Sequence, residues 1–233
     1  MMKHETPRDV INAGLKLLNN GLVSRTWGNV SVRIDGDYMF VTPKGRKYTD
    51  LTEKDIVKVN IHTLDYQGDI VPTSECKMHA AIYRKYKKVN ACIHTHQMNA
   101  STCAVAGKTV PPVLDDFAQI SGPSCRVAPY ALPGTKKLTK GVVKALKGRK
   151  SCLLANHGAV CVGDDLEDAF VVSEVLEKNC KAYIESSFIG GANKINKFEA
   201  YLMHKVYLKK YSKDASINIS KEDQNDEKRQ STD

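Results

Sequence analysis

Residues 91–96 read Ala-Cys-Ile-His-Thr-His, a short apolar run that ends in two histidines separated by one residue. Its length and apolar character predict a buried β-strand over residues 91–95. Side chains two residues apart on a strand point to the same face of the sheet. The imidazoles of His94 and His96 are therefore expected to reach one point in space.

A third histidine and a carboxylate could join this pair. His157 falls in the turn between two short apolar runs, 152–155 and 159–162, and Glu75 stands at the start of an expected helix. Three histidines, one carboxylate and an open position are typical of a catalytic site for a divalent metal, most often zinc. The alternative is a chance His-x-His pattern whose rings are hydrogen-bonded near the surface. The remaining histidines have no such neighbours: His4, His62, His79 and His204.

Outward from this strand, further strands alternate with amphipathic helices. Residues 30–34 and 38–41 flank an Asp-Gly-Asp turn and predict a hairpin, and residues 56–61 predict another strand. Ser74 is the expected cap of a helix that runs to residue 86. A connection rich in proline and glycine spans residues 111–134. Other helices are expected between Pro7 and Gly21 and over residues 135–146, 166–185 and 197–211. The pattern predicts an α/β chain, with a strand order that periodicity does not give.

The composition fits one substantial α/β domain. Of the 233 residues, 42% are hydrophobic and 26% are charged, and the seven cysteines are widely spread without a Cys-x-x-Cys pair. A disulfide framework and a zinc finger are therefore not expected, and most thiols should be buried and reduced. No apolar run approaches the ~20 residues of a membrane helix, and residues 1–5 begin no signal peptide. We expect a cytoplasmic protein without a membrane partner.

The formal net charge of +9 raises the question of nucleic-acid binding. Basic residues gather at 84–88, 136–140 and 144–150, the later ones at roughly helical spacing, as on a solvated helix face. No aromatic interleaving, RNP-like run or helix-turn-helix pattern accompanies them, so a nucleic-acid partner is not expected. A basic surface also raises the local concentration of a small phosphorylated metabolite.

Three loops are suited to an anion. The residues Thr-Trp-Gly-Asn at 26–29 precede a strand, Thr-Pro-Lys-Gly at 42–45 follow one, and Thr73 and Ser74 precede a helix. Each loop offers backbone N–H or hydroxyl donors, and a helix N-terminus favours an anion. Each is also an ordinary turn or cap when taken alone. None matches a P-loop or a dinucleotide-binding fingerprint.

The order of these short motifs resembles the class II aldolase/adducin family. The motifs are Gly-Asn-x-Ser at 28–31, Thr-Pro-x-Gly at 42–45, Ser-Glu at 74–75, His-x-His at 94–96, Ala-Pro-Tyr with Gly-Thr between 128 and 135, and Asn-His-Gly at 156–158. The resemblance runs from about residue 7 to residue 190 and weakly onward to Tyr211. It implies a single three-layer α/β/α domain around a largely antiparallel central sheet, over residues 1–211. Residues 212–233 hold few large apolar side chains and are expected to be a disordered, charged tail.

The resemblance also implies a site. One zinc ion per subunit would be bound by His94, His96 and His157, with Glu75 alternating between metal ligand and acid/base. The active sites would lie between neighbouring subunits of a C4 homotetramer. The substrate phosphate would be held by Gly28, Asn29, Lys44, Gly45, Thr73 and Ser74.

Two positions of the family pattern concern proton transfer. Aldolases of the family carry a tyrosine near the position of Asp115, whereas this chain has no tyrosine between Tyr86 and Tyr130. An aspartate here, Asp115 or its neighbour Asp116, is similar to the related ribulose-phosphate epimerases. A second family tyrosine, near the C-terminus, matches Tyr211 best and Tyr207 less well.

The expected activity is therefore that of a zinc-dependent aldehyde-lyase. It would cleave a phosphorylated ketose, L-fuculose 1-phosphate or a related deoxy-ketose 1-phosphate, to dihydroxyacetone phosphate and an aldehyde. The same scaffold leaves open a pentulose-phosphate 4-epimerase, a sugar-acid phosphate decarboxylase and a methylthioribulose-phosphate dehydratase. A non-enzymatic, adducin-like interaction module is a further alternative, against which the retained ligand set argues.

Overall fold

The computed structural model describes residues 5–34 and 36–210. At its centre these residues form a seven-stranded sheet in the order β3-β2-β1-β4-β7-β6-β5. Neighbouring strands pair antiparallel except β5 and β6, which are parallel. The strands are β1 (Asn29–Arg33), β2 (Tyr38–Val41), β3 (Val57–Asn60), β4 (Ala91–Thr95), β5 (Arg126–Ala128), β6 (Ser151–Leu154) and β7 (Gly158–Gly163).

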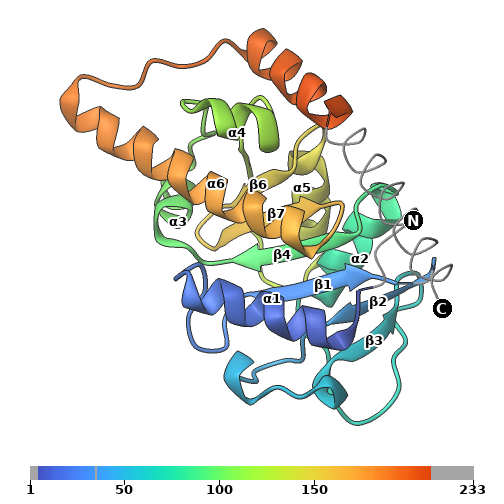
Figure 1. Ribbon diagram of the computed structural model, residues 1–233. Helices are drawn as coiled ribbons and strands as arrows, with labels where there is room; N and C mark the ends of the chain where they lie inside the picture. The colour runs from blue at the N-terminus through green and yellow to red at the C-terminus, as the bar shows by residue number, and fades with distance from the viewer. Residues whose placement is uncertain (1–4, 35, 211–233) are drawn as a thin grey trace, which may run out of the picture.

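Helices cover both faces of this sheet and make three layers (Figure 1). They are α1 (Pro7–Asn19), α2 (Cys76–Lys85), α3 (Met98–Val105), α4 (Asp115–Ile120), α5 (Lys136–Leu146) and α6 (Leu166–Ser186). Helices α2 and α5 pack on one face, and α1, α3, α4 and α6 pack on the other. The expected α/β/α domain with a largely antiparallel sheet is confirmed.

Strand β4 shows how the two layers are separated. Cys92 packs into the core beneath α2 and α5, whereas Ala91 and Ile93 pack beneath α1 and α6. This alternation is the period of two that a strand imposes. His94 continues the Cys92 side, so its ring points towards α2 rather than towards α6.

The start of α2 differs from the prediction in one respect. Ser74 was the expected cap, but the N-cap position is occupied by Glu75, and no side chain caps this helix. The Glu75 carboxylate instead accepts a hydrogen bond from Asn29 on β1. Helix α2 thus lacks a capping side chain, and the residue at its N-cap position is fixed by a contact with β1. The other predicted starts hold, since Thr6 and Thr135 cap α1 and α5 with their side chains.

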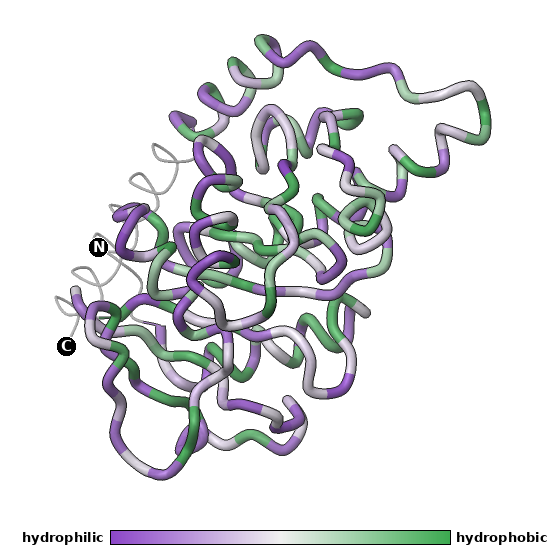
Figure 2. Tube along the Cα trace, turned by 180° about the vertical axis from the view of Figure 1, so that it is seen from behind, coloured by the Kyte–Doolittle hydropathy of each residue, from purple (hydrophilic) through white to green (hydrophobic). Residues whose placement is uncertain are grey.

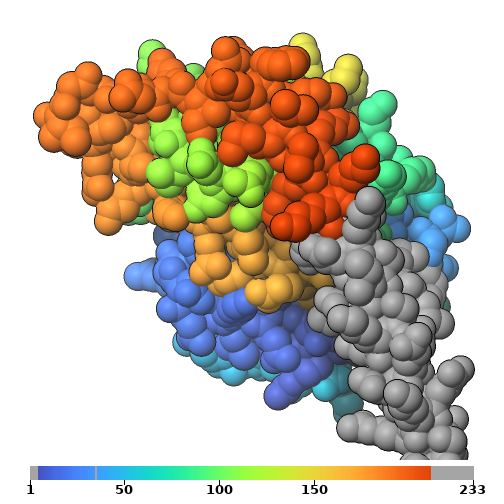
Figure 3. Space-filling view, turned by 45° about the horizontal axis from the view of Figure 1, so that its top comes forward, coloured from blue at the N-terminus to red at the C-terminus, as the bar shows by residue number. Residues whose placement is uncertain are grey.

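Two α-helices and one strand were not predicted. Helix α3 follows directly after the His-x-His motif, and α4 and β5 lie inside the connection rich in proline and glycine. Beyond α6, residues 197–210 form the expected C-terminal helix. It lies alongside α4, as Figure 3 shows, with His204 Nδ1 donating to the Gln119 carbonyl over 2.6 Å. Hydrophobic and hydrophilic residues alternate along it (Figure 2). Tyr211 and the predicted tail at 212–233 lie outside the described residues.

Two further expectations can be compared with the structure. All seven cysteines are buried and unpaired, as predicted for reduced thiols in a core. Over residues 5–34 and 36–210, none of the helices has the length and apolar character needed to cross a membrane.

Candidate metal centre

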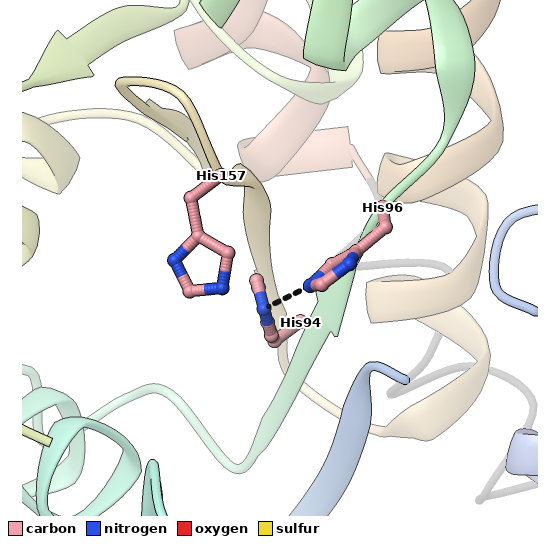
Figure 4. Close-up of side chains that lie close together, drawn as sticks. All are labelled: His94, His96 and His157. Atoms are coloured by element: carbon pink, nitrogen blue, oxygen red, sulfur yellow. Dashed lines mark hydrogen bonds between the residues drawn. The ribbon is translucent and has the colours of Figure 1, made fainter. Parts of the chain in front are cut away.

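Three histidines converge at one end of the central strands. His94 lies on β4, His96 follows that strand, and His157 lies in the turn between β6 and β7. Their candidate ligand nitrogens all lie within 4.8 Å of one another. Figure 4 shows the three rings facing a common space. The prediction that these histidines come together is confirmed.

The turn that carries His157 has an unusual backbone. Asn156 adopts a left-handed conformation with φ of 57°, which asparagine tolerates better than most residues. The next residue after His157 is Gly158, where a Cβ atom would lie 2.2 Å from the carbonyl oxygen of Thr95. A glycine at 158 therefore lets β7 approach β4 closely enough to bring His157 beside His94.

Hydrogen bonding determines which nitrogen of His94 faces the cluster. His94 Nδ1 lies 2.8 Å from the carbonyl oxygen of Ala159, and a carbonyl only accepts, so Nδ1 carries the proton. In the tautomer that this contact selects for a neutral ring, the Nε2 atom presents its lone pair to the cluster. It lies 2.9 Å from His96 Nε2 and 3.1 Å from Glu75 Oε2. A backbone carbonyl that orients the ring in this way is the usual second contact of a metal-binding histidine.

Glu75, at the start of α2, adds a carboxylate to the three histidines. It is buried, and its Oε1 atom lies 3.7 Å from His157 Nε2. Burial raises the pKa of Glu75, while the imidazoles of His94 and His157 and the hydrogen bond from Asn29 lower it; the net pKa lies below the ordinary value. Among the described residues, Oε1 has no hydrogen-bond partner. This orphaned carboxylate oxygen faces the cluster.

The donor set fits a divalent cation. Burial, with the neighbouring imidazoles of His94 and His157, lowers the pKa of His96 to about 4, and burial also lowers the pKa of His157. The rings of His96 and His157 are therefore neutral near pH 7 and can offer lone pairs. A positive charge between them would stabilise lone pairs and a carboxylate that converge in a buried space. Imidazole nitrogens with a carboxylate suit zinc and its neighbours among the transition metals.

Two of the predicted phosphate loops meet beside this group. The loop after β2 and the loop before α2 are joined by an isolated bridge between Pro43 and Pro72, and Thr73 N donates to the Thr42 carbonyl over 3.1 Å. Lys44 and Gly45 are exposed on one loop, and Ser74 on the other. Phosphate binding by these loops stays a prediction.

The first loop contributes through its backbone. Gly28 has a φ of 75°, and a Cβ atom there would lie 2.7 Å from the His94 carbonyl oxygen. The Asn29 side chain turns inwards: its Nδ2 donates to Glu75 Oε2 over 2.9 Å, and its Oδ1 accepts from His79. Any phosphate contact of Asn29 in this conformation would therefore use its backbone.

The acid/base candidates outside the cluster are placed differently. Asp115 is exposed at the start of α4, and no hydrogen bond or ion pair joins it to the histidines within the described part of the chain. Asp116 pairs with Lys178 over 2.6 Å and accepts from the backbone of Phe117. Asp116 is thereby occupied, whereas Asp115 is free to meet another molecule. Tyr211 lies outside the described residues.

Sequence reasoning missed one polar residue beside the site. His79 has no such neighbours in the sequence, but in the structure it is fully buried and hydrogen-bonded to Asn29 and Ser31. Its spacing from Glu75 was the available signal, because residues four apart on a helix lie on one face.

Comparison with known proteins agrees with this geometry. The sequence model described as the Class II Aldolase and Adducin N-terminal domain matches residues 8–184. The chain belongs to the class II aldolase and adducin family. A 5-deoxy-D-ribulose 1-phosphate aldolase of Bacillus thuringiensis serovar kurstaki is 31% identical over 211 residues, which is 86% of this chain and 99% of that protein.

Other class II aldolases give the same picture. The L-fuculose phosphate aldolase of Escherichia coli K12 is 33% identical over 184 residues, 79% of this chain and 85% of that protein. A solved structure of an L-fuculose 1-phosphate aldolase superposes with a TM-score of 0.84 at 32% identity and covers 89% of this chain and 98% of that one. The class II aldolase fold therefore extends over nearly the whole described chain.

Proposed function

We propose that this chain cleaves a deoxy-ketose 1-phosphate to dihydroxyacetone phosphate and an aldehyde, with one zinc ion per subunit. The aldehyde-lyase class follows from the family match and the aldolase relatives. The observation that carries the proposal is the convergence of His94, His96 and His157 on the buried carboxylate of Glu75, whose Oε1 has no partner.

The residues divide the chemistry between them. His94, His96 and His157 would hold the metal, which as a Lewis acid polarises the ketone and stabilises negative charge that develops on its oxygen. Cleavage breaks the bond between the third and fourth carbons of the ketose, and the electron pair stays on the third carbon. In cleavage, the Glu75 carboxyl delivers from Oε1 a proton that it has taken up from water, and it becomes a carboxylate; in the reverse direction that carboxylate takes the proton from the third carbon.

A second proton leaves the hydroxyl on the fourth carbon as that carbon becomes the aldehyde. We propose Asp115 of a neighbouring subunit and Tyr211 for this transfer. Asp115 is exposed and, among the described residues, makes no hydrogen bond or ion pair with the histidines of its own chain, which supports a contribution from another copy. Trp27, which is 54% exposed and stacks on His96 at 6.1 Å, offers an apolar surface beside the site for that copy. A homotetramer is the assembly we propose.

The substrate phosphate would bind at the loops that carry Gly28, Asn29, Lys44, Gly45, Thr73 and Ser74. Anchoring the phosphate away from the reacting carbon orients the substrate before the bond breaks. The preference for a deoxy sugar rests on three relatives: the two already described and a 5-methylthioribulose-1-phosphate/5-deoxyribulose-1-phosphate aldolase of Rhodospirillum rubrum, 33% identical over 174 residues. A cytoplasmic location stays a prediction from the sequence.

The test combines metal analysis with a panel of phosphorylated sugars and a coupled assay for dihydroxyacetone phosphate. We expect about one zinc per chain, cleavage of a deoxy-ketose 1-phosphate, and loss of activity on chelation that added zinc restores. The panel includes substrates for the epimerase, decarboxylase and dehydratase reactions. A protein that releases no dihydroxyacetone phosphate, or whose activity resists chelation, would refute the proposal.

A further inference from the structure

A chain of buried polar groups starts at Glu75 Oε2, the oxygen that also lies 3.1 Å from His94 Nε2. Glu75 Oε2 accepts from Asn29 Nδ2 over 2.9 Å, and Asn29 Oδ1 lies 2.6 Å from His79 Nε2. His79 Nδ1 lies 2.6 Å from Ser31 Oγ, which in turn lies 2.8 Å from the Tyr83 hydroxyl. All five side chains are buried. These hydrogen bonds therefore link the candidate acid/base to buried groups on β1 and α2.

The direction of each hydrogen bond follows from the two ends. A carboxylate only accepts, so the nitrogen of the Asn29 amide faces Glu75 and its oxygen faces His79. His79 must then donate from Nε2, which leaves Nδ1 as the acceptor of the Ser31 hydroxyl. Ser31 in turn accepts from Tyr83.

Strand β1 and helix α2 position these groups. Asn29 and Ser31 are two apart on β1 and share one face, and His79 follows Glu75 by one helical turn on α2. Burial lowers the pKa of His79 to about 4, so its ring is neutral and has a single donor. The ring therefore has no freedom to change its role near neutral pH.

We propose that His79 is a positioning residue that acts on Glu75 through Asn29. By fixing the amide of Asn29, His79 holds Glu75 Oε2 and leaves Oε1, which has no partner, as the oxygen that exchanges protons with the substrate. This inference rests on the proposed role of Glu75. Without the donor on His79, the amide of Asn29 can turn, and the carboxylate loses the contact that separates its two oxygens.

Two substitutions that differ by one methylene separate this role from packing. His79→Gln places an amide nitrogen where Nε2 stands and can donate to Asn29 Oδ1. His79→Asn is shorter, reaches only towards Ser31, and leaves Asn29 Oδ1 without a donor. Ser31→Ala removes the contact at the far side of the ring. Ser151→Ala is the matched control, because it removes another buried hydrogen bond, the 2.5 Å contact between Ser121 and Ser151.

The measurements are kcat and KM for cleavage, and the exchange of the hydroxymethyl hydrogen of dihydroxyacetone phosphate with deuterated water, followed by NMR. We expect His79→Asn to lower kcat and the exchange rate about 100-fold, the cost of misplacing a reacting group, with KM and zinc content unchanged. His79→Gln should stay about tenfold above His79→Asn, the factor that one hydrogen bond provides. Ser31→Ala should give a smaller loss of exchange, and Ser151→Ala none.

The outcomes are distinguishable. If the wild-type protein neither cleaves the sugar nor exchanges the hydrogen, the proposed function is wrong and this inference falls with it. If the wild-type protein is active and His79→Asn matches it, or if the Asn and Gln variants lose activity only in parallel with their melting temperatures, the positioning role alone is wrong. Should His79→Asn fail to fold, a wild-type exchange rate in Ser31→Ala would likewise overturn it.

Discussion

Replacing Gly28 by alanine should damage the metal site through its backbone, without touching any ligand. Gly28 has a φ of 75°, and its added Cβ would lie 2.5 Å from Val23 Cγ1 and 2.7 Å from the His94 carbonyl oxygen. The positive φ alone costs an alanine about 1–2 kcal/mol. The two close contacts add an overpacking cost of about 1–3 kcal/mol, since Val23 is buried and the His94 carbonyl belongs to the central sheet.

Gly148 provides a matched control. Its φ is 76°, nearly that of Gly28, but a Cβ there meets nothing within 4 Å. Gly148→Ala should therefore lose only the backbone cost of about 1–2 kcal/mol, whereas Gly28→Ala should lose about 2–5 kcal/mol. The difference between the two variants isolates the cost of the two close contacts, with Val23 and with the His94 carbonyl oxygen.

Urea unfolding followed by circular dichroism gives the two free energies, and zinc titration gives the affinity. Trp27, the single tryptophan of the chain, stacks on His96 and reports on the site by fluorescence. We expect Gly28→Ala to bind zinc more weakly, because metal–ligand distances tolerate only about 0.2 Å, and Gly148→Ala to bind it normally. Equal stability and equal zinc affinity in the two variants would refute the reasoning.

Three further predictions use other parts of the site. His96→Ala should lower zinc affinity strongly. His62→Ala, which changes an exposed histidine paired with Asp37, should leave zinc affinity unchanged. An unchanged zinc content in His96→Ala would remove His96 from the ligand set. In the metal-free protein, burial lowers the pKa of His79 to about 4, from 6.5 in the unfolded chain. Between these two pKa values the unfolded chain is protonated at His79 and the folded chain is not. The free energy of unfolding therefore falls as the pH falls through this window. Urea unfolding should show a loss of stability between pH 7 and pH 5 that is about 2 kcal/mol smaller in His79→Gln than in the wild-type protein, because the other buried rings, such as His96, still titrate. Asp115→Asn should lower kcat about 100-fold without changing stability. Asp116→Asn should lose only the surface ion pair with Lys178, which contributes about 1 kcal/mol or less to stability. Equal kcat values for the two variants would remove Asp115 from proton transfer.

The histidine cluster was predictable because each part of it follows a simple rule. The His-x-His motif on a strand places two rings on one face, and the turn before β7 carries the third ring to the neighbouring strand. The pairing of β4 with β7 supplies the long-range contact that the sequence does not state. The short turn between the two apolar runs brings the three histidines together, because it returns the chain as an antiparallel strand, β7, that pairs with β4.

The parts that were missed lack such a rule. Helix α4 has six residues and lies among prolines and glycines, so no periodicity is long enough to detect it. Ser74 satisfied the preference for a cap, but a tertiary contact of Glu75 with Asn29 overrode it. His79 could not be told from any other core residue on the inner face of a helix. Its hydrogen-bond partners, Asn29 and Ser31, lie on β1 and produce no pattern in the sequence around His79.

The register of the sheet explains why so few residues create the site. Asn29 on β1 pairs directly with His94 on β4, and paired residues on adjacent strands project to the same face. Helix α2 packs over that face and places Glu75 between them, one turn before His79. A slip of one residue between β1 and β4 would turn Asn29 to the opposite face and leave Glu75 with unpaired oxygens in a buried space. The same antiparallel pairing that builds the core thus determines which oxygen of Glu75 is held and which is left to react.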